Sequence, residues 1–147
     1  MALALLDCSV ADQRPPDILV SNGWTREVAP GQTAAALYLT IANKGEGRDR
    51  LVSVETAQGE ASLHRTSSAD GVARMRPLDD GLEIAPQSTV ELKPGGTHIM
   101  LTGLEQPPRA GQTVALTLAF ERSGERPVEV RVIAAGADAH SAHGTGK

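Results

Sequence analysis

Aromatic residues and cysteine are scarce in this chain of 147 residues. One Trp, one Tyr and one Phe make up 2% of it, so there is little material for the stacked aromatic platforms that hold bases or sugars. The single cysteine, Cys8, has no second cysteine with which to form an internal disulfide. A chain of this length can bury a core without one, and its length predicts a single domain.

Basic charge and long apolar runs are lacking as well. The 14 Lys and Arg residues are scattered and are outnumbered by 18 Asp and Glu, for a net charge of -4, which argues against a nucleic-acid partner. The apolar run at residues 2–6 is too short for a membrane span or a complete export signal, so we expect no span and interpret residues 1–16 as a leader remnant or flexible segment. Lipidation at Cys8 is disfavoured, because Asp7 stands where such sites have a small residue.

Sequence signatures of catalysis are missing too. There is no nucleophile elbow, no Gly-rich phosphate loop and no His-Glu-x-x-His helix. Ser67 and Asp70 follow His64 but do not form a recognisable catalytic set with it. Asp79-Asp80 is interpreted as a turn. The sequence therefore predicts a protein that is not an enzyme.

What the chain does contain is a regular succession of strand-like segments. Runs of alternating or β-branched residues recur about every 8 to 12 residues between Pro and Gly, and no stretch keeps a 3.6-residue period. This predicts an all-β, antiparallel sandwich or barrel over residues 17–134, followed by a small, polar, flexible tail at residues 135–147. The expected strands lie at residues 18–24, 33–45, 49–57, 60–66, 71–78, 81–86, 88–96, 98–104, 113–121 and 128–133.

The histidines and methionines of the folded body are concentrated in one part of the chain. Apart from the first residue and two tail histidines, they lie within 37 positions, and they are His64, Met75, His98 and Met100. His98 and Met100 are two apart on an expected strand, so both side chains point to one face, with Cα atoms about 7 Å apart. Ile99 and Leu101 point to the other face and are expected to hold the strand to the core.

Two imidazoles and two thioethers favour Cu(I). Thioether is a soft, uncharged ligand that competes well for cuprous ion and poorly for Mg²⁺, Ca²⁺ or Zn²⁺. A zinc site would have Cys or carboxylate in place of the methionines. A blue-copper electron-transfer site would add a thiolate, and no cysteine lies near these four residues. Neutral ligands around a monovalent ion suit a protein that holds copper and passes it on.

Two other interpretations stay open on the residues alone. In the first, the methionines fill space and the histidines are incidental, and the chain is a non-catalytic β-sandwich module that recognises another protein. That interpretation predicts no defined one-to-one Cu(I) complex. In the second, the chain is a copper oxidoreductase, which predicts visible Cu(II) absorption with reversible cycling. The missing cysteine counts against it.

The spacing of the four residues resembles the copper-binding signature of the PCuAC family of periplasmic copper chaperones. That signature is His or Met, ten residues, Met, twenty-one residues and then His-x-Met, and here the two intervals are ten and twenty-two residues. The segments NGWTREVAPGQTAAALYLTIANKG and LAFERSGERPVEVRV also look like the family's, and the resemblance covers about residues 18–133. The extra residue is expected in a turn at Asp79-Asp80-Gly81.

The resemblance implies a single-domain, cupredoxin-like Greek-key β-sandwich without a cupredoxin's cysteine. It implies that His64, Met75, His98 and Met100 bind Cu(I). It also implies export to the periplasm or outer face, with the signal peptide absent from or removed in this chain. Family members deliver copper toward the dinuclear copper centre of cytochrome c oxidase, so the expected partner is the oxidase's copper subunit or a Sco-like thioredoxin-fold protein. We expect a monomer.

Other residues are candidates for secondary roles. The tail histidines His140 and His143 are a candidate Cu(II) site, with a solvated tail as the alternative. Trp24 is expected to be a packing anchor. Three arginines flank His64 and Met75 and form either a docking rim for an acidic partner or a solvated charged edge; they are Arg65, Arg74 and Arg76.

Ligation of Cu(I) by imidazole predicts a dependence on pH. Thioethers do not titrate, so only the imidazoles compete with protons. With an ordinary imidazole pKa of about 6.5, Cu(I) affinity is expected to fall below about pH 6.5. Competition titrations against a chromophoric chelator measure this. An affinity that stays flat from about pH 8 to about pH 5 would exclude imidazole ligation.

Overall fold

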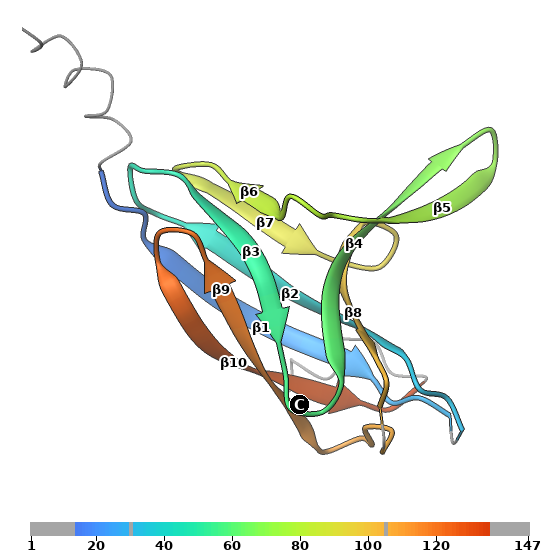
Figure 1. Ribbon diagram of the computed structural model, residues 1–147. Helices are drawn as coiled ribbons and strands as arrows, with labels where there is room; N and C mark the ends of the chain where they lie inside the picture. The colour runs from blue at the N-terminus through green and yellow to red at the C-terminus, as the bar shows by residue number, and fades with distance from the viewer. Residues whose placement is uncertain (1–13, 30, 105, 136–147) are drawn as a thin grey trace, which may run out of the picture.

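In the part of the chain that the structure describes, most residues lie in strands and none lies in a helix (Figure 1). The computed structural model describes residues 14–29, 31–104 and 106–135. The strands are β1 (Ile18–Arg26), β2 (Ala35–Asn43), β3 (Asp49–Glu55), β4 (Glu60–Ala69), β5 (Val72–Pro77), β6 (Leu82–Ile84), β7 (Ser88–Leu92), β8 (Thr97–Thr102), β9 (Thr113–Phe120) and β10 (Gly124–Ile133). Each expected strand segment overlaps one strand of this described part, and β1, β4, β8 and β10 extend beyond the predicted bounds.

The strands form one mixed sheet. Their order is β5-β4-β8-β2-β1-β10-β9-β3-β6, with β7 paired to β2 beside this path. Neighbours pair antiparallel, as predicted, except that β1 runs parallel to β10, with Trp24 opposite Arg131. Parallel neighbours need a long connection. β1 and β10 can satisfy this because they come from opposite ends of the domain.

One hydrophobic core lies between two layers of this sheet. It contains residues from β4 and β8 and also from β3 and β6, and these two pairs of strands lie toward opposite ends of the strand order. The sheet therefore folds back on itself, which confirms the predicted single-domain β-sandwich (Figure 1). Ile99 and Leu101 are fully buried, as their place on the inner face of β8 predicted.

Strand β3 departs from the predicted alternation. Leu51 and Val54 are both buried, although they lie three residues apart, and Ser53 is exposed. The pairing of β3 with β9 shifts register between Leu51 and Ser53. A β-bulge of this kind adds one residue to one strand and resets which side chains face inward.

The β4–β5 hairpin extends beyond the sandwich (Figure 1). Asp70 and Gly71 join the two strands with φ values of 55° and 78°, and Ala69 pairs with Val72 on either side of them. Two positive φ values in a two-residue loop are typical of a type I′ hairpin turn, for which Asp-Gly is a favoured sequence. The last core residue of β4 is Leu63, so the rest of the hairpin lies outside the core.

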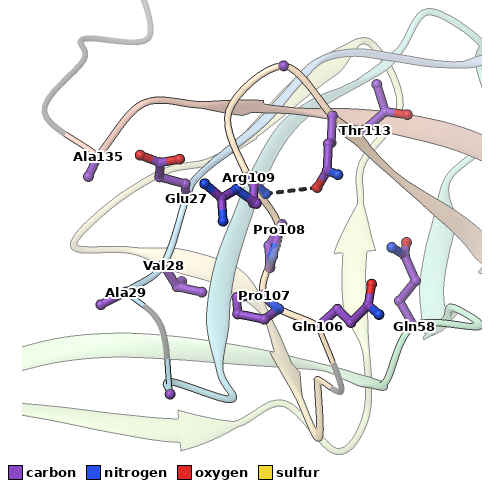
Figure 2. Close-up of a pocket in the computed structure, with 13 residues that line it drawn as sticks. Glu27, Val28, Ala29, Gln58, Gln106, Pro107, Pro108, Arg109, Thr113 and Ala135 are labelled. Atoms are coloured by element: carbon purple, nitrogen blue, oxygen red, sulfur yellow. Dashed lines mark hydrogen bonds between the residues drawn. The ribbon is translucent and has the colours of Figure 1, made fainter.

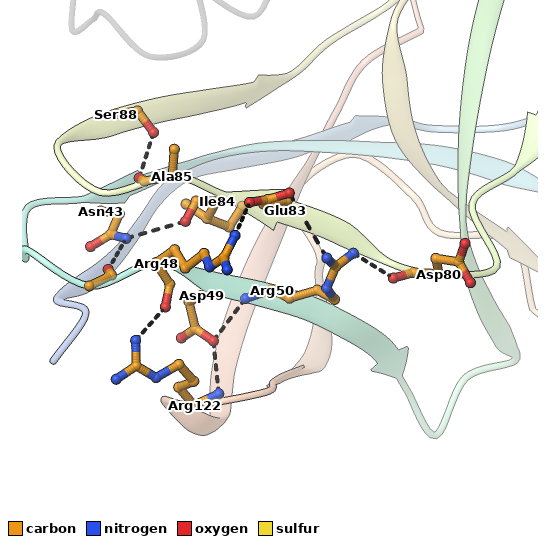
Figure 3. A network of polar contacts seen from close by, with 11 residues as sticks. Asn43, Arg48, Asp49, Arg50, Asp80, Glu83, Ile84, Ala85, Ser88 and Arg122 are labelled. Carbon is orange, nitrogen blue, oxygen red and sulfur yellow. Dashed lines mark hydrogen bonds and ion pairs between the residues drawn. The ribbon is translucent and has the colours of Figure 1, made fainter. Parts of the chain in front are cut away.

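Buried Asp49 holds the loop between β9 and β10 (Figure 3). Its carboxylate accepts hydrogen bonds from the backbone N–H groups of Arg50, Arg122 and Ser123 and from the Ser123 hydroxyl. β10 consequently begins at Gly124, which pairs with Phe120. The sequence placed the turn around Gly124 and began this strand at residue 128, so the hairpin is longer than predicted.

Replacing Asp49 with Ala is expected to lower the free energy of unfolding by about 3 kcal/mol, because several partly buried donors lose their acceptor. Denaturant titration of the wild type and the variant measures the loss. Asp79→Ala, at an exposed turn position, is the matched control and should change stability by less than about 0.5 kcal/mol. Equal effects of the two substitutions would contradict this role of Asp49.

Candidate metal centre

The register of β4 with β8 brings two of the four predicted ligands together. His64 lies directly opposite His98, and Ser62 lies opposite Met100. The imidazole rings are stacked, with centroids 6.1 Å apart and planes inclined by 17°. Because side chains two apart share a face of a strand, Met100 lies on the same face as both histidines. Leu63, the neighbour of His64 on β4, points to the other face and is buried in the core.

Met75 reaches the same face from the hairpin. It pairs with Thr66 across the hairpin, and Thr66 is two residues beyond His64, so all three side chains lie on one face. The Met75 sulfur Sδ is 3.1 Å from Nε2 of His98. A thioether on β5 thus meets an imidazole on β8, although β4 lies between these strands.

A backbone carbonyl fixes the orientation of the His98 ring. Its Nδ1 is 3.1 Å from the carbonyl oxygen of Gly96. A carbonyl only accepts, so Nδ1 carries the proton in the neutral ring and Nε2 has a free lone pair. That lone pair is on the nitrogen nearest Met75 Sδ. A histidine anchored through one nitrogen in this way is pre-oriented to bind a metal through the other.

His64 has a nitrogen without a partner. Its Nε2 is 2.9 Å from the Ser62 hydroxyl, whereas Nδ1 is buried and has no hydrogen-bond partner in the described part of the chain. A buried polar atom left unpaired is costly and is rarely retained without a reason. When Nε2 donates to the Ser62 hydroxyl, Nδ1 presents a free lone pair to a ligand.

The four side chains differ in exposure. His98 is 6% exposed and Met75 is 49% exposed, while His64 and Met100 are half-buried. The cluster is therefore shielded from solvent at His98 and accessible to solvent at Met75. Its donors are two neutral imidazoles and two thioethers, a soft set suited to Cu(I). In residues 14–29, 31–104 and 106–135, no three His, Cys, Asp or Glu side chains gather into a group that could hold a metal ion.

A row of aromatic rings continues from His98 across the sheet. The Tyr38 ring lies 6.4 Å from that of His98, and the Trp24 ring lies 4.7 Å from that of Tyr38, measured between centroids. The guanidinium of Arg26 lies 4.9 Å from the centre of the Trp24 ring. Burial raises the pKa of Tyr38 above its usual 10.0 and outweighs the opposite effect of Arg26, so the phenol is neutral at physiological pH.

Several features of this face were not predicted from sequence. Trp24 packs as expected, but it is half-buried on the outer face and not part of the core. Tyr38 was missed because its contact with His98 depends on how β2 and β8 pair. Ser62 could have been found, since it stands two residues before His64. His64 lies within the sheet, on β4 between β5 and β8.

The three arginines lie on the other face of the hairpin. Arg65 pairs with Arg76 and Ser67 pairs with Arg74, so these arginines and Met75 point to opposite faces.

The predicted turn at Asp79-Asp80-Gly81 is present. The Gly81 N–H donates to the Leu78 carbonyl at 3.1 Å, and Gly81 has a φ of 83°. Four residues named above lie outside the described part of the chain, namely Asp7, Cys8, His140 and His143.

One surface hollow lies away from this cluster. It is lined mainly by polar, proline and small residues, among them Glu27, Gln58, Pro107, Pro108 and Arg109 (Figure 2). Gln58 stands just before the start of β4, whereas the β4–β5 turn is at the far end of that strand. The lining contains no His, Met or Cys, so the hollow offers none of the soft donors found in the cluster.

Comparison with known proteins identifies the class. The fold matches PCuAC domains of known structure. "Copper-bound PCuAC domain from PmoF2" is 28% identical, with a TM-score of 0.66 over 80% of this chain and 92% of that one. "Solution structure of CuI-DR1885 from Deinococcus Radiodurans" is 27% identical, with a TM-score of 0.64 over 87% of this chain and 85% of that one.

The family follows from the sequence match. The family model described as "Putative lipoprotein LpqE-like" matches residues 18–132, and the chain belongs to this LpqE-like family, which is of the PCuAC type. "Putative lipoprotein Lxx21020" of Leifsonia xyli subsp. xyli is 36% identical over 116 residues, 78% of this chain and 69% of that protein.

The ring of His98 is expected to be the Nδ1–H tautomer, because its Nδ1 faces the Gly96 carbonyl. Long-range proton–nitrogen correlation spectra of the metal-free protein distinguish the two nitrogens, at about pH 8 where imidazoles are neutral. We expect the proton on Nδ1 and a free lone pair on Nε2. A spectrum that places the proton on Nε2 would contradict the arrangement described above.

Proposed function

We propose that this protein is a Cu(I)-binding metallochaperone, with His64, Met75, His98 and Met100 as its ligands. The observation that carries the proposal is the 3.1 Å approach of Met75 Sδ to His98 Nε2, the nitrogen that the Gly96 carbonyl leaves unprotonated. A soft sulfur and an imidazole lone pair are thereby placed side by side. The unpartnered Nδ1 of His64 supplies a second nitrogen donor on the same face.

The site's lack of charge suits temporary binding. All four ligands are neutral, and the phenol of Tyr38 beside His98 stays neutral because burial raises its pKa. No anionic ligand adds Coulombic attraction to the soft donor bonds. Copper held only by such bonds can be given up to a partner with stronger ligands.

Transfer is expected to begin at Met75. This residue is 49% exposed and lies on the edge strand of the sheet, whereas His98 is buried and anchored to the backbone. A partner's cysteine or methionine can replace the Met75 sulfur while the imidazoles still hold the ion. The direction of transfer then depends on the partner, because thiolates bind Cu(I) more strongly than thioethers.

The cellular setting is part of the proposal. Relatives with "lipoprotein" in their names support a location outside the cytoplasm, and we propose the periplasm or outer face. No helix in the described residues is long and apolar enough to cross a membrane. The proposed acceptor is the copper subunit of cytochrome c oxidase or a Sco-like thioredoxin-fold protein. The proposed role is non-enzymatic, since copper is bound and released unchanged.

Replacing either methionine by leucine tests the site. Leucine keeps the volume of methionine and removes the sulfur. In anaerobic competition titrations, wild-type protein is expected to bind one equivalent of Cu(I). Met75→Leu and Met100→Leu are each expected to lose about tenfold or more in affinity, which corresponds to about 1.4 kcal/mol.

Val72→Ala is the matched control, because Val72 is also exposed on β5 but faces away from the cluster. It should bind copper like the wild type. Weak Cu(I) binding by the wild type would contradict the proposed site. So would a Cu(I) affinity that neither leucine substitution changes, because the His and Met residues would then have structural roles only.

A further inference from the structure

The β4–β5 hairpin carries a second, chemically different surface behind the copper ligands. Arg65, Arg74 and Arg76 share the hairpin face opposite Met75, and all three are exposed. Arg65 and Arg76 are direct cross-strand partners. Exposed Val72, two residues before Arg74, lies on the same face. We call these four residues the arginine face.

Nothing in the described part of the chain neutralises this face. Like charges directly opposite each other on a sheet are destabilising. The Arg65 Nε–H donates to the Thr97 hydroxyl, a neutral group, at 3.2 Å. The ion pairs recorded among the described residues involve Arg14, Arg48 and Arg50, and none involves Arg65, Arg74 or Arg76. An anionic group bound between the two arginines would remove their mutual repulsion, and this explains why they lie opposite each other.

The arginine face also stands out from the rest of the molecule. The chain carries a net charge of -4, yet the β4–β5 hairpin, residues 60–77, contains three arginines and two acidic residues, Glu60 at its start and Asp70 in its turn. The face lies outside the sandwich, on the projecting hairpin seen in Figure 1. Its strand β5 ends the sheet and pairs with β4 alone among the described strands. A partner can therefore approach along the whole strand.

We infer that the arginine face is a docking site for an acidic protein surface on the copper partner. The inference rests on the proposed function and goes beyond it by naming where the partner binds and with what chemistry. Arginine forks bind carboxylates in bidentate fashion, which fixes orientation as well as adding affinity. Opposite charge also accelerates encounter between proteins.

The position of Met75 explains why such a surface would matter for transfer. Met75 stands between Arg74 and Arg76 in sequence and points to the other face of a two-stranded ribbon. Arginine side chains are long enough to extend around the exposed edge of β5. An acidic partner held along that edge would bring its own copper ligands next to the most exposed ligand of the site.

The test uses a peptide of seven glutamates as the acidic probe and a peptide of seven glutamines as its neutral control. The full chain, labelled with nitrogen-15, is titrated with each peptide while backbone amide shifts are followed. We expect shifts concentrated on β4 and β5 with the glutamate peptide only. They should be lost in salt of about 0.5 M, which screens exposed charges beyond a few ångströms.

Arg74→Glu and Arg76→Glu are each expected to weaken binding of the glutamate peptide by about tenfold or more. Arg109→Glu is the matched control, since it makes the same charge change in an exposed loop away from the hairpin and should keep at least about half of the wild-type affinity. Shifts centred away from the hairpin, or equal losses in all three variants, would overturn the docking site.

Two further measurements separate this inference from its alternatives. The Cu(I) affinity of Arg74→Glu is measured and should equal that of the wild type. This measurement distinguishes a failure of the docking site from a failure of the copper site. Binding to vesicles of phosphatidylglycerol is measured in parallel. Vesicle binding that depends on Arg74, without any response to the glutamate peptide, would overturn the protein-docking inference in favour of a lipid surface.

Discussion

The antiparallel pairing of β4 with β8 is the constraint on which the rest of the structure depends. It places His64 opposite His98 and Ser62 opposite Met100. Because side chains alternate between faces, a slip of one residue would turn His98 toward the core and Ile99 toward solvent. Complete burial of Ile99 and Leu101 prevents that slip. The apolar residues between the proposed ligands are thus as important to the site as the ligands themselves.

The proposed site combines a fixed part and an accessible part. His98 is buried and hydrogen-bonded to the Gly96 carbonyl, so its free nitrogen has a defined direction. Met75 comes from a hairpin outside the core and is half exposed. A carrier needs both properties, since a rigid nitrogen selects and holds the ion while an exposed sulfur can be exchanged. The arginine face places partner recognition on the same hairpin as the exchangeable ligand.

Much of this could be predicted from the sequence, because it depends on local patterns. Spacing of turns gave the strands, and the two-residue period put His98 and Met100 on one face with Ile99 on the other. What could not be predicted depends on pairing between distant segments. The bulge in β3, the parallel contact of β1 with β10 and the approach of Tyr38 to His98 are of this kind. Alternation along the strand separates Arg74 and Arg76 from Met75, but only the hairpin register places Arg65 directly opposite Arg76.

The central claim is that one Cu(I) ion is bound jointly by two imidazoles and two thioethers drawn from three strands. X-ray absorption spectroscopy at the copper edge, on protein loaded anaerobically with one equivalent of Cu(I), tests it most directly. The account predicts both sulfur and nitrogen scatterers around a cuprous ion, two of each. A spectrum fitted by nitrogen and oxygen alone would contradict it, because the methionines would then have no part in holding the metal.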